Sequence, residues 1–167
     1  MSVVAVKINP DTIDLCSDSF IGGLYQQTKI EFVKSFQVNN MAVGGSGGAE
    51  ELSLFKIFCQ NHSPATDNED GVIDFFVEFT EWTKKKDASF KLNNVYILIY
   101  RFKVFYVNGL YVREISDHWA VGAGEIHAKA ALYLGHSAYE AVNVACELSP
   151  WCEAPINTIT IEKGEQK

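Results

Sequence analysis

The sequence predicts a single α+β domain, because strand-like and helix-like segments come in alternating groups along one uninterrupted chain. The 167 residues are 47% hydrophobic and 13% aromatic, which suits one domain with a sizeable core and excludes a disordered chain. No repeat, linker or change of composition divides residues 1–167. Two stacked sheets with a helix pair on each outer side would accommodate the order of the segments, although composition alone does not select this arrangement over another α+β fold.

The first part of the chain is expected to form a series of strands. Residues 3–6 are a continuous apolar run, Asn9-Pro10-Asp11 is a turn signal, and residues 29–36 alternate polar and apolar side chains. These patterns are typical of strands with one or both faces buried, joined by turns. The expected strands are residues 3–6, 12–18, 20–25, 29–36 and 41–43.

Two helices are expected next, at residues 49–61 and 72–82. Leu52, Phe55 and Cys59 recur on one face of the first helix, and the second is rich in phenylalanine. The phenylalanines of both segments offer more apolar surface than one sheet face needs, so we expect them to support self-assembly. They are Phe55, Phe58, Phe75, Phe76 and Phe79.

Three further strands are expected at residues 95–101, 103–107 and 110–115. Asn108-Gly109 between the last two is the clearest hairpin turn in the chain, because both residues tolerate the positive φ of a type I′ turn.

The last third of the chain combines a glycine-rich corner, two helices and a strand. The corner is Gly122-Ala123-Gly124, and Gly135 is placed to end the helix that follows it. Ser137 and Glu140 have the spacing of a capping box at the start of the second helix. Ile156, Ile159 and Ile161 are expected in a closing strand, after a turn bracketed by Pro150 and Pro155.

Small apolar residues are expected to attach both of these helices to a sheet. Their helical spacing predicts one buried face on each helix. The expected faces are Ile126, Ala130, Ala131 and Leu134 in the first helix, and Ala138, Ala141, Val142, Ala145 and Leu148 in the second.

Charge and cysteine usage exclude several classes of function. The net charge of −7 and a pI near 5.0 argue against binding to nucleic acid. The basic run at residues 84–86 ends an apolar-periodic segment, where cations are favourable at a helix C-terminus. Cys16, Cys59, Cys146 and Cys152 have neither CxxC nor zinc-ligand spacing, so we expect small core residues and no metal.

A reducing cytoplasmic location is the default expectation. Lys7, Asp11 and Asp14 interrupt any N-terminal apolar region of a signal peptide. No apolar run reaches the ~18 residues of a membrane span, so no membrane association is expected.

The C-terminal unit resembles the proteasome β-subunit family, in particular bacterial ring peptidases such as HslV. The matching pieces are "AVGAG" at 120–124, the alanine-rich helix after it, "SAYEAVNVACEL" at 137–148 and "SPWCEAPINTITI" at 149–161. With the N-terminal half, the resemblance covers most of the chain. It implies a four-layer αββα sandwich of the N-terminal nucleophile hydrolase type, a homo-oligomeric ring with a possible ATPase cap, a peptide substrate and no cofactor.

The resemblance also implies candidate catalytic residues. The family's nucleophile is the hydroxyl of an N-terminal Thr whose α-amine, with a pKa of ~7.7–8.0, serves as the general base. Here Ser2 would fill both roles after removal of Met1, although the strand register favours Met1 in the nucleophile's place. Asp18 resembles the acidic residue that supports a lysine beside the nucleophile, and Lys29 is the first candidate for that lysine.

Lys34 is the second candidate for this lysine. Gly47 resembles the glycine whose backbone N–H forms the oxyanion hole at a helix start. The glycine-rich stretch around it is not a nucleotide-binding P-loop, because no Gly-Lys-Ser/Thr follows.

Three positions depart from the family pattern. Its serine in the glycine corner falls on Ala123, its aspartate before the final turn falls on Ser149, and its serine in that turn falls on Cys152. Losing such polar supports usually lowers the rate by orders of magnitude. Three functions therefore stay open: a ring-forming peptidase that uses Ser2, a catalytically silent assembly or interaction subunit, and an amidase acting on a small molecule.

Overall fold

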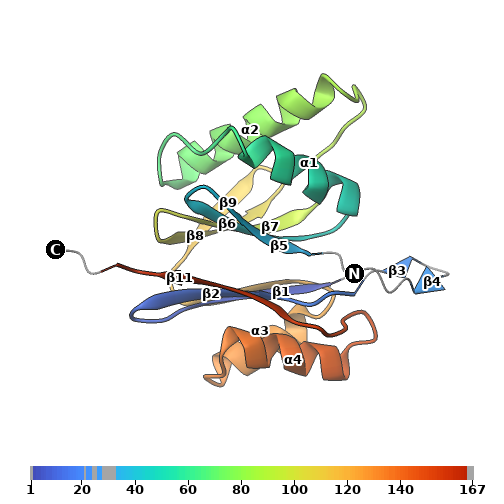
Figure 1. Cartoon of the computed structure of the whole chain (residues 1–167), viewed down its shortest axis with the longest axis vertical. Coiled ribbons are helices and arrows are strands. Elements are labelled where there is room, and N and C mark those ends of the chain that lie inside the picture. Colours follow the sequence, from blue (N-terminus) through green and yellow to red (C-terminus); the bar gives the residue numbers. More distant parts are fainter. Residues whose placement is uncertain (1, 21, 24–25, 28–32, 165–167) are drawn as a thin grey trace.

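Two antiparallel sheets stack face to face, and a pair of helices covers the outer side of each (Figure 1). The computed structural model describes residues 2–20, 22–23, 26–27 and 33–164. The four layers are those of the αββα sandwich of N-terminal nucleophile hydrolases, so the expected fold class is confirmed.

The first sheet contains four strands in the order β10-β1-β2-β11. Its two central strands are the apolar N-terminal segments, which pair with Val4 opposite Ser17. The glycine corner ends β10, where Gly122 pairs with Val3. The strands are β1 (Val3–Ile8), β2 (Thr12–Ser17), β10 (His118–Gly122) and β11 (Asn157–Glu162).

The second sheet contains five strands in the order β5-β6-β7-β8-β9, each paired with its neighbour in the sequence. The expected hairpin joins β8 and β9, but its two loop residues are Gly109 and Leu110, because Asn108 pairs with Tyr111. Gly109 has the positive φ, 59°, that such a turn needs. The strands are β5 (Ser35–Val38), β6 (Met41–Ser46), β7 (Val95–Tyr100), β8 (Lys103–Asn108) and β9 (Tyr111–Ile115).

The strand expected at residues 29–36 is only partly described. Residues 28–32 lie outside the described residues, and the described strand, β5, begins at Ser35 and runs two residues past Phe36. Within the expected segment at 20–25, the described residues are Phe20 and the two-residue strand β3 (Gly22–Gly23), which pairs with β4 (Gln26–Gln27).

The aromatic layer, α1 (Ala49–Cys59) and α2 (Glu69–Lys84), packs on the five-stranded sheet. The expectation that its phenylalanines form an assembly surface is wrong, because all of them are buried. Phe55 lies at the centre, with its ring centroid 4.9 Å from Phe76 and 4.8 Å from both Phe79 and Tyr96. The phenylalanine rings therefore fill the space between these helices and the five-stranded sheet.

The alanine layer, α3 (Glu125–Tyr133) and α4 (Ala138–Leu148), packs on the four-stranded sheet. The expected capping box of α4 is confirmed: the Ser137 hydroxyl accepts from the Glu140 backbone N–H, and the Glu140 carboxylate accepts from the Ser137 N–H. Most of the expected face of α4 is buried, but Leu148 is 62% exposed.

The buried face expected for α3 is largely wrong. Ile126 and Leu134 are each 75% exposed, and the residues that face the sheet are Ala128, Ala131 and Leu132. The helix carries two apolar faces, and the one made of smaller side chains packs inward because it lets the helix approach the sheet closely.

Neither a metal-binding group nor a membrane-spanning helix occurs among the described residues. Within them, no group of three His, Cys, Asp or Glu side chains is placed to hold a metal ion. None of the helices in this described part is long and apolar enough to cross a membrane. All four cysteines are free thiols.

Candidate functional site

Side chains alternate along β1, and this alternation determines where Ser2 points. Val3 packs with the alanine layer, whereas Val4 and Val6 pack between the two sheets. The Ser2 hydroxyl lies on the same side as Val4, because its Oγ is 2.8 Å from Oγ of Ser46 in the opposite sheet. Ser2 is only 2% exposed. The candidate nucleophile is thus enclosed in a hydroxyl pair that joins the two sheets.

Asp18, directly after β2, is fully buried and accepts hydrogen bonds from three backbone N–H groups. They belong to Val3 at 2.8 Å, Phe20 at 3.1 Å and Glu153 at 3.3 Å. A buried carboxylate is stable when its oxygens are satisfied in this way. Asp18 therefore ties the start of β1 to the turn before β11.

The lysine that pairs with Asp18 is Lys34, the second of the two candidates. Its Nζ lies 2.7 Å from Oδ1 of Asp18, and the residue is 4% exposed. Burial lowers the pKa of Lys34, and the Asp18 carboxylate opposes this effect. Lys29, the first candidate, lies outside the described residues.

A second hydroxyl pair was not foreseen. The Oγ atoms of Ser17 in β2 and Ser35 in β5 are 2.9 Å apart, so this pair also joins the two sheets. Ser17 follows the apolar alternation of β2 and Ser35 follows Lys34 directly. Ser17, Ser35 and Ser46 are small polar residues at inward-facing strand positions, and this pattern could have predicted hydrogen bonds between the sheets.

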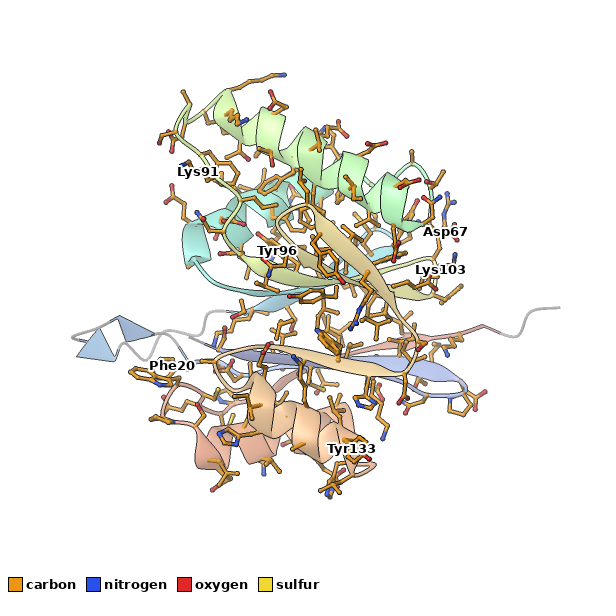
Figure 2. All side chains as sticks on the ribbon, turned by 180° about the vertical axis from the view of Figure 1, so that it is seen from behind. Phe20, Asp67, Lys91, Tyr96, Lys103 and Tyr133 are labelled. Atoms are coloured by element: carbon orange, nitrogen blue, oxygen red, sulfur yellow. The ribbon has the colours of Figure 1, made fainter. Side chains whose placement is uncertain are left out.

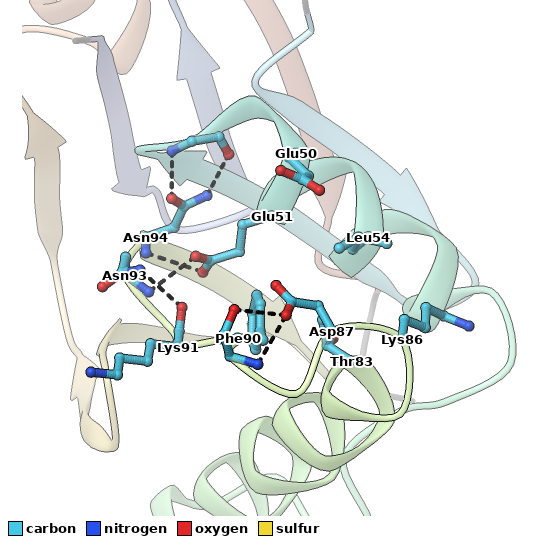
Figure 3. Close-up of a pocket in the computed structure, with 12 residues that line it drawn as sticks. Glu50, Glu51, Leu54, Thr83, Lys86, Asp87, Phe90, Lys91, Asn93 and Asn94 are labelled. Carbon is cyan, nitrogen blue, oxygen red and sulfur yellow. Dashed lines mark hydrogen bonds between the residues drawn. The ribbon is translucent and has the colours of Figure 1, made fainter.

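Gly47 precedes α1 by two residues, and the helix begins at Ala49 with Gly48 as its N-cap. The φ of Gly47 is +143°, and a Cβ on it would lie 2.0 Å from Oδ1 of Asn94. The Asn94 carboxamide accepts from the Gly48 N–H at 2.6 Å and donates to the Gly48 carbonyl at 2.9 Å (Figure 3). The buried Asn94 side chain, which sequence reasoning missed, therefore clamps the glycine turn at the position expected for an oxyanion hole.

The glycine corner packs against the start of β1. The Gly124 N–H donates to the Ser2 carbonyl at 3.2 Å. A Cβ on Gly124 would lie 2.6 Å from Sγ of Cys152 and 3.0 Å from Cβ of Ala145. Burial raises the pKa of the Cys152 thiol, which keeps it in the neutral form at neutral pH. Cys152 thus acts as a small packing group under the corner.

The other two positions that depart from the family pattern have local structural roles or none. The Ser149 hydroxyl accepts from the Trp151 N–H at 3.3 Å in the turn after α4. Ala123 is exposed in the corner. Neither residue contacts Lys34 through a hydrogen bond in the described part of the chain.

The pocket drawn in Figure 3 is lined by Gly48 and Asn94 of the glycine turn but not by Ser2, Asp18 or Lys34. It has a volume of about 510 Å³ and opens between the N-terminus of α1 and the segment that joins α2 to β7. Its charged lining residues are Glu50, Glu51, Lys86, Asp87 and Lys91. Glu51 already accepts from two backbone N–H groups and the Tyr96 hydroxyl, so its carboxylate anchors β7 to α1.

The fold is a proteasome-like sandwich of the N-terminal nucleophile hydrolase type. Two structures of BPH from Thiobacillus denitrificans match at 18% identity over 96% of this chain. One, in complex with epoxomicin, has a TM-score of 0.83 and is covered over 98% of its chain; the other has a TM-score of 0.82 and is covered over 97%. Eukaryotic HslV from Trypanosoma brucei matches with a TM-score of 0.73 at 18% identity, over 96% of this chain and 99% of that chain.

These likenesses establish the fold. No family profile and no curated protein sequence matches the chain.

Proposed function

We propose that the chain is a proteasome-like subunit that assembles with copies of itself, and that the Ser2 hydroxyl is a structural group and not a nucleophile. The observation that carries the second part is the hydroxyl pair between Ser2 and Ser46. An attacking hydroxyl has to reach a substrate carbonyl and a base. Ser2 is 2% exposed and its hydroxyl is directed into the space between the sheets.

The position of the Asp18–Lys34 pair supports the same proposal. Asp18 contacts the backbone N–H of Val3, whose side chain lies on the opposite side of β1 from the Ser2 hydroxyl. In the described residues the Lys34 ammonium donates to Asp18 and the Ser2 hydroxyl pairs with Ser46, and no hydrogen bond joins Lys34 or Asp18 to the Ser2 hydroxyl.

A peptidase that uses Ser2 is the second candidate, and the buried ion pair favours it. Taking a carboxylate and an ammonium out of water costs several kcal/mol per ion in real proteins, and Lys34 and Asp18 are both almost fully buried. In this candidate, Ser2 is N-terminal, its amine is the base, and the hydroxyl rotates away from Ser46 to reach a peptide substrate.

Peptide hydrolysis by preparations of known mass distinguishes the two candidates. Under the structural proposal, a preparation whose intact mass shows a free Ser2 cleaves fluorogenic peptides no faster than its Ser2→Ala variant. Epoxomicin, the ligand in the BPH complex, serves as a second probe and should bind neither. Turnover that disappears in Ser2→Ala would establish Ser2 as the nucleophile and refute the structural proposal.

A double-mutant cycle between Ser2 and Ser46 tests the structural role directly. Ser2→Ala leaves the buried Ser46 hydroxyl without its partner, which costs about 1–3 kcal/mol of unfolding free energy. If the hydroxyls form a pair, Ser2→Ala with Ser46→Ala costs less than the sum of the single changes. Additive single changes would contradict the pair.

Self-assembly is supported by an apolar stripe on the outer face of α3, formed by Ile126, Ala130, Tyr133 and Leu134. All four are exposed, with Ile126 and Leu134 at 75% and Tyr133 at 83%. Their spacing places them on one side of the helix. Tyr133, labelled in Figure 2, lies on the outer side of the alanine layer.

The stripe fits a second copy of the same helix. When two antiparallel α3 helices cross at Ala130, Ile126 of one lies opposite Leu134 of the other, and the alanine allows close approach at the centre. Such a two-fold contact is self-complementary. Other subunit contacts would extend the pair to a ring.

Sedimentation tests this contact. Ile126→Glu combined with Leu134→Glu should lower the assembly state at micromolar concentration, because charge is introduced at both ends of the stripe. Ile57→Glu on α1 is the control, since Ile57 is another exposed apolar residue, at 50%, but lies on the aromatic layer. A wild-type chain that sediments only as a monomer would refute self-assembly, and loss of assembly in the control alone would place the contact on α1.

A further inference from the structure

A cleft of about 250 Å³ lies where the chain crosses from one sheet to the other between β9 and β10. Residues 113–119 line it. It shares no residue with the start of β1 or with the α3 stripe.

Trp119 on β10 carries an unpartnered donor beside this cleft. Within residues 2–20, 22–23, 26–27 and 33–164, its indole Nε1 is the one buried side-chain nitrogen or oxygen without a hydrogen-bond partner. A buried polar group of this kind costs free energy until it meets an acceptor. The indole N–H is a donor only, so the missing partner has to be an acceptor atom.

Two cations lie against the same indole ring. The Arg113 guanidinium carbon is 4.4 Å and the Lys129 Nζ is 4.1 Å from the ring centroid. Tyr106 packs edge-on against Trp119, with the ring centroids 5.7 Å apart. The indole thus joins residues from three layers of the fold: β8 and β9 of one sheet, β10 of the other, and α3.

Of the positive charges around the indole ring, one has no carboxylate partner in the described part of the chain, so a ligand with a single negative charge would balance it. Lys129 pairs with Glu125 at 3.3 Å, and Asp117 lies 2.6 Å from Nδ1 of His118. No carboxylate of the described residues lies within 4.0 Å of the Arg113 guanidinium. Arg113 therefore provides the uncompensated positive charge, and a guanidinium fork has the geometry to hold a carboxylate with two hydrogen bonds.

We propose that the cleft binds the carboxylate of a small monoanionic ligand, which accepts hydrogen bonds from Trp119 Nε1 and the Arg113 guanidinium. A carboxylate has the acceptor atoms that the indole lacks and the single charge that Arg113 balances. Phosphate, with a higher charge, would meet Asp117 and Glu125 without enough cations to offset it. Nε1 lies under neighbouring side chains, so binding requires one of the two long side chains on the ring to rotate.

The first experiment follows the three tryptophans by ¹⁹F NMR in the full chain labelled with 5-fluorotryptophan, with Trp119→Phe assigning the Trp119 signal. N-acetylglycine is the probe, and N-acetylglycinamide is the neutral control of the same shape. The Trp119 signal should shift in a saturable way with a dissociation constant on the order of 1 mM, and the neutral control should cause no such shift. A Trp119 signal that does not respond to N-acetylglycine would overturn the proposal.

Two variants and a second anion sharpen this test. Arg113→Gln should weaken binding by about tenfold or more, since it removes the charge that balances the carboxylate. Lys103→Gln is the matched control, because Lys103 lies near Asp67 away from the indole, and it should leave binding unchanged. Equal binding by Arg113→Gln, or saturation by inorganic phosphate but not by N-acetylglycine, would overturn the assignment of a carboxylate.

Discussion

The two helix layers solve the same packing problem with opposite side chains. In the aromatic layer, Phe55, Phe76 and Phe79 fill the space between the helices and the five-stranded sheet. In the alanine layer, Ala141 and Ala145 with other small residues bring the helices close to the four-stranded sheet. Each residue buries a large area in the first layer and a small area in the second. The first layer should therefore be most sensitive to truncation of a large side chain, and the second to enlargement of a small one.

The difference also determines what each layer presents outside. The outer face of α2 is acidic, with exposed Asp70, Asp74, Glu78 and Glu81. The outer face of α3 is apolar, because Ile126, Tyr133 and Leu134 are exposed on it. An exposed apolar stripe on a helix that packs through alanine is typical of an interaction surface.

Truncating a side chain at the centre of the aromatic layer should cause the largest loss of stability. Phe55→Ala removes a fully buried ring that contacts Phe76, Phe79 and Tyr96, and we expect it to lower the free energy of unfolding by about 3–5 kcal/mol. Urea denaturation measures this change. Ile57→Ala, on the same helix but 50% exposed, should stay within about 0.5 kcal/mol. Similar losses in both variants would show that the ring cluster is not the centre of the layer.

The buried thiol of the aromatic layer should make stability depend on alkaline pH. Burial raises the pKa of Cys59 to about 12, whereas an unfolded thiol has a pKa of about 8.5. The folded chain then holds a proton that the unfolded chain loses, so this stability is complete below the unfolded pKa and is lost as pH rises toward the folded pKa.

Removing this thiol should flatten the alkaline pH dependence. Between pH 9 and 10.5 we expect the unfolding free energy of Cys59→Ala to fall less steeply than that of the wild type, by about 1.4 kcal/mol per pH unit. Ile57→Ala should keep the wild-type slope. Equal slopes in all three proteins would mean that Cys59 titrates alike in both states.

Large side chains made the aromatic layer predictable, and small ones limited the prediction of the alanine layer. Phe55 and Phe76 strongly favour a buried position, so periodicity was enough to place their helices. The phenylalanines were nevertheless interpreted as more apolar surface than the sheet needs, whereas the structure buries them. In α3, periodicity selects Ile126 and Leu134 as strongly as Ala128 and Ala131, because alanine carries little hydrophobic signal. Only the close approach of helix and sheet decides between the faces.

Overpacking tests this close approach. Ala145 is fully buried, and a Cβ on Gly124 would lie 3.0 Å from its Cβ. Ala145→Leu should therefore cost about 1–3 kcal/mol. Ala130→Leu on the exposed face of α3 is the matched control and should leave the monomer's stability within about 0.5 kcal/mol. A variant at Ala145 that melts like the wild type would mean that α4 does not press against the corner.

The candidate site was predictable where the family resemblance points to a particular residue. Asp18 was found because it resembles the family's acidic residue after the second strand, and it pairs with Lys34. Sequence spacing could not rank Lys34 above Lys29, because both lie in the same strand-like segment, residues 29–36. Asn94 and Ser46 were missed because their partners are 46 and 44 residues away in the sequence, and no local pattern reports such contacts.

Helix capping gives the smallest expected effect and compares the layers at one matched position. In the alanine layer, Ser137 and Glu140 form a complete capping box; in the aromatic layer, Asn68 accepts from the Gly71 N–H at 3.0 Å. Ser137→Ala and Asn68→Ala should each cost about 1 kcal/mol, measured by urea denaturation at pH 7.

Acid should separate the two caps. Hydrogen bonds from Ser137 lower the pKa of Glu140. The stability from this carboxylate is therefore present above the unfolded pKa of Glu and is lost as pH falls through the folded pKa. The Ser137 hydroxyl also donates to Oε2 of Glu140 at 2.8 Å. Ser137→Ala removes this bond, and because protonated Glu140 is a poorer acceptor, the cost of the substitution should shrink in acid. The cost of Asn68→Ala should stay constant, because an amide does not titrate. If both costs change with pH to the same extent, the Glu140 carboxylate contributes nothing to the α4 cap.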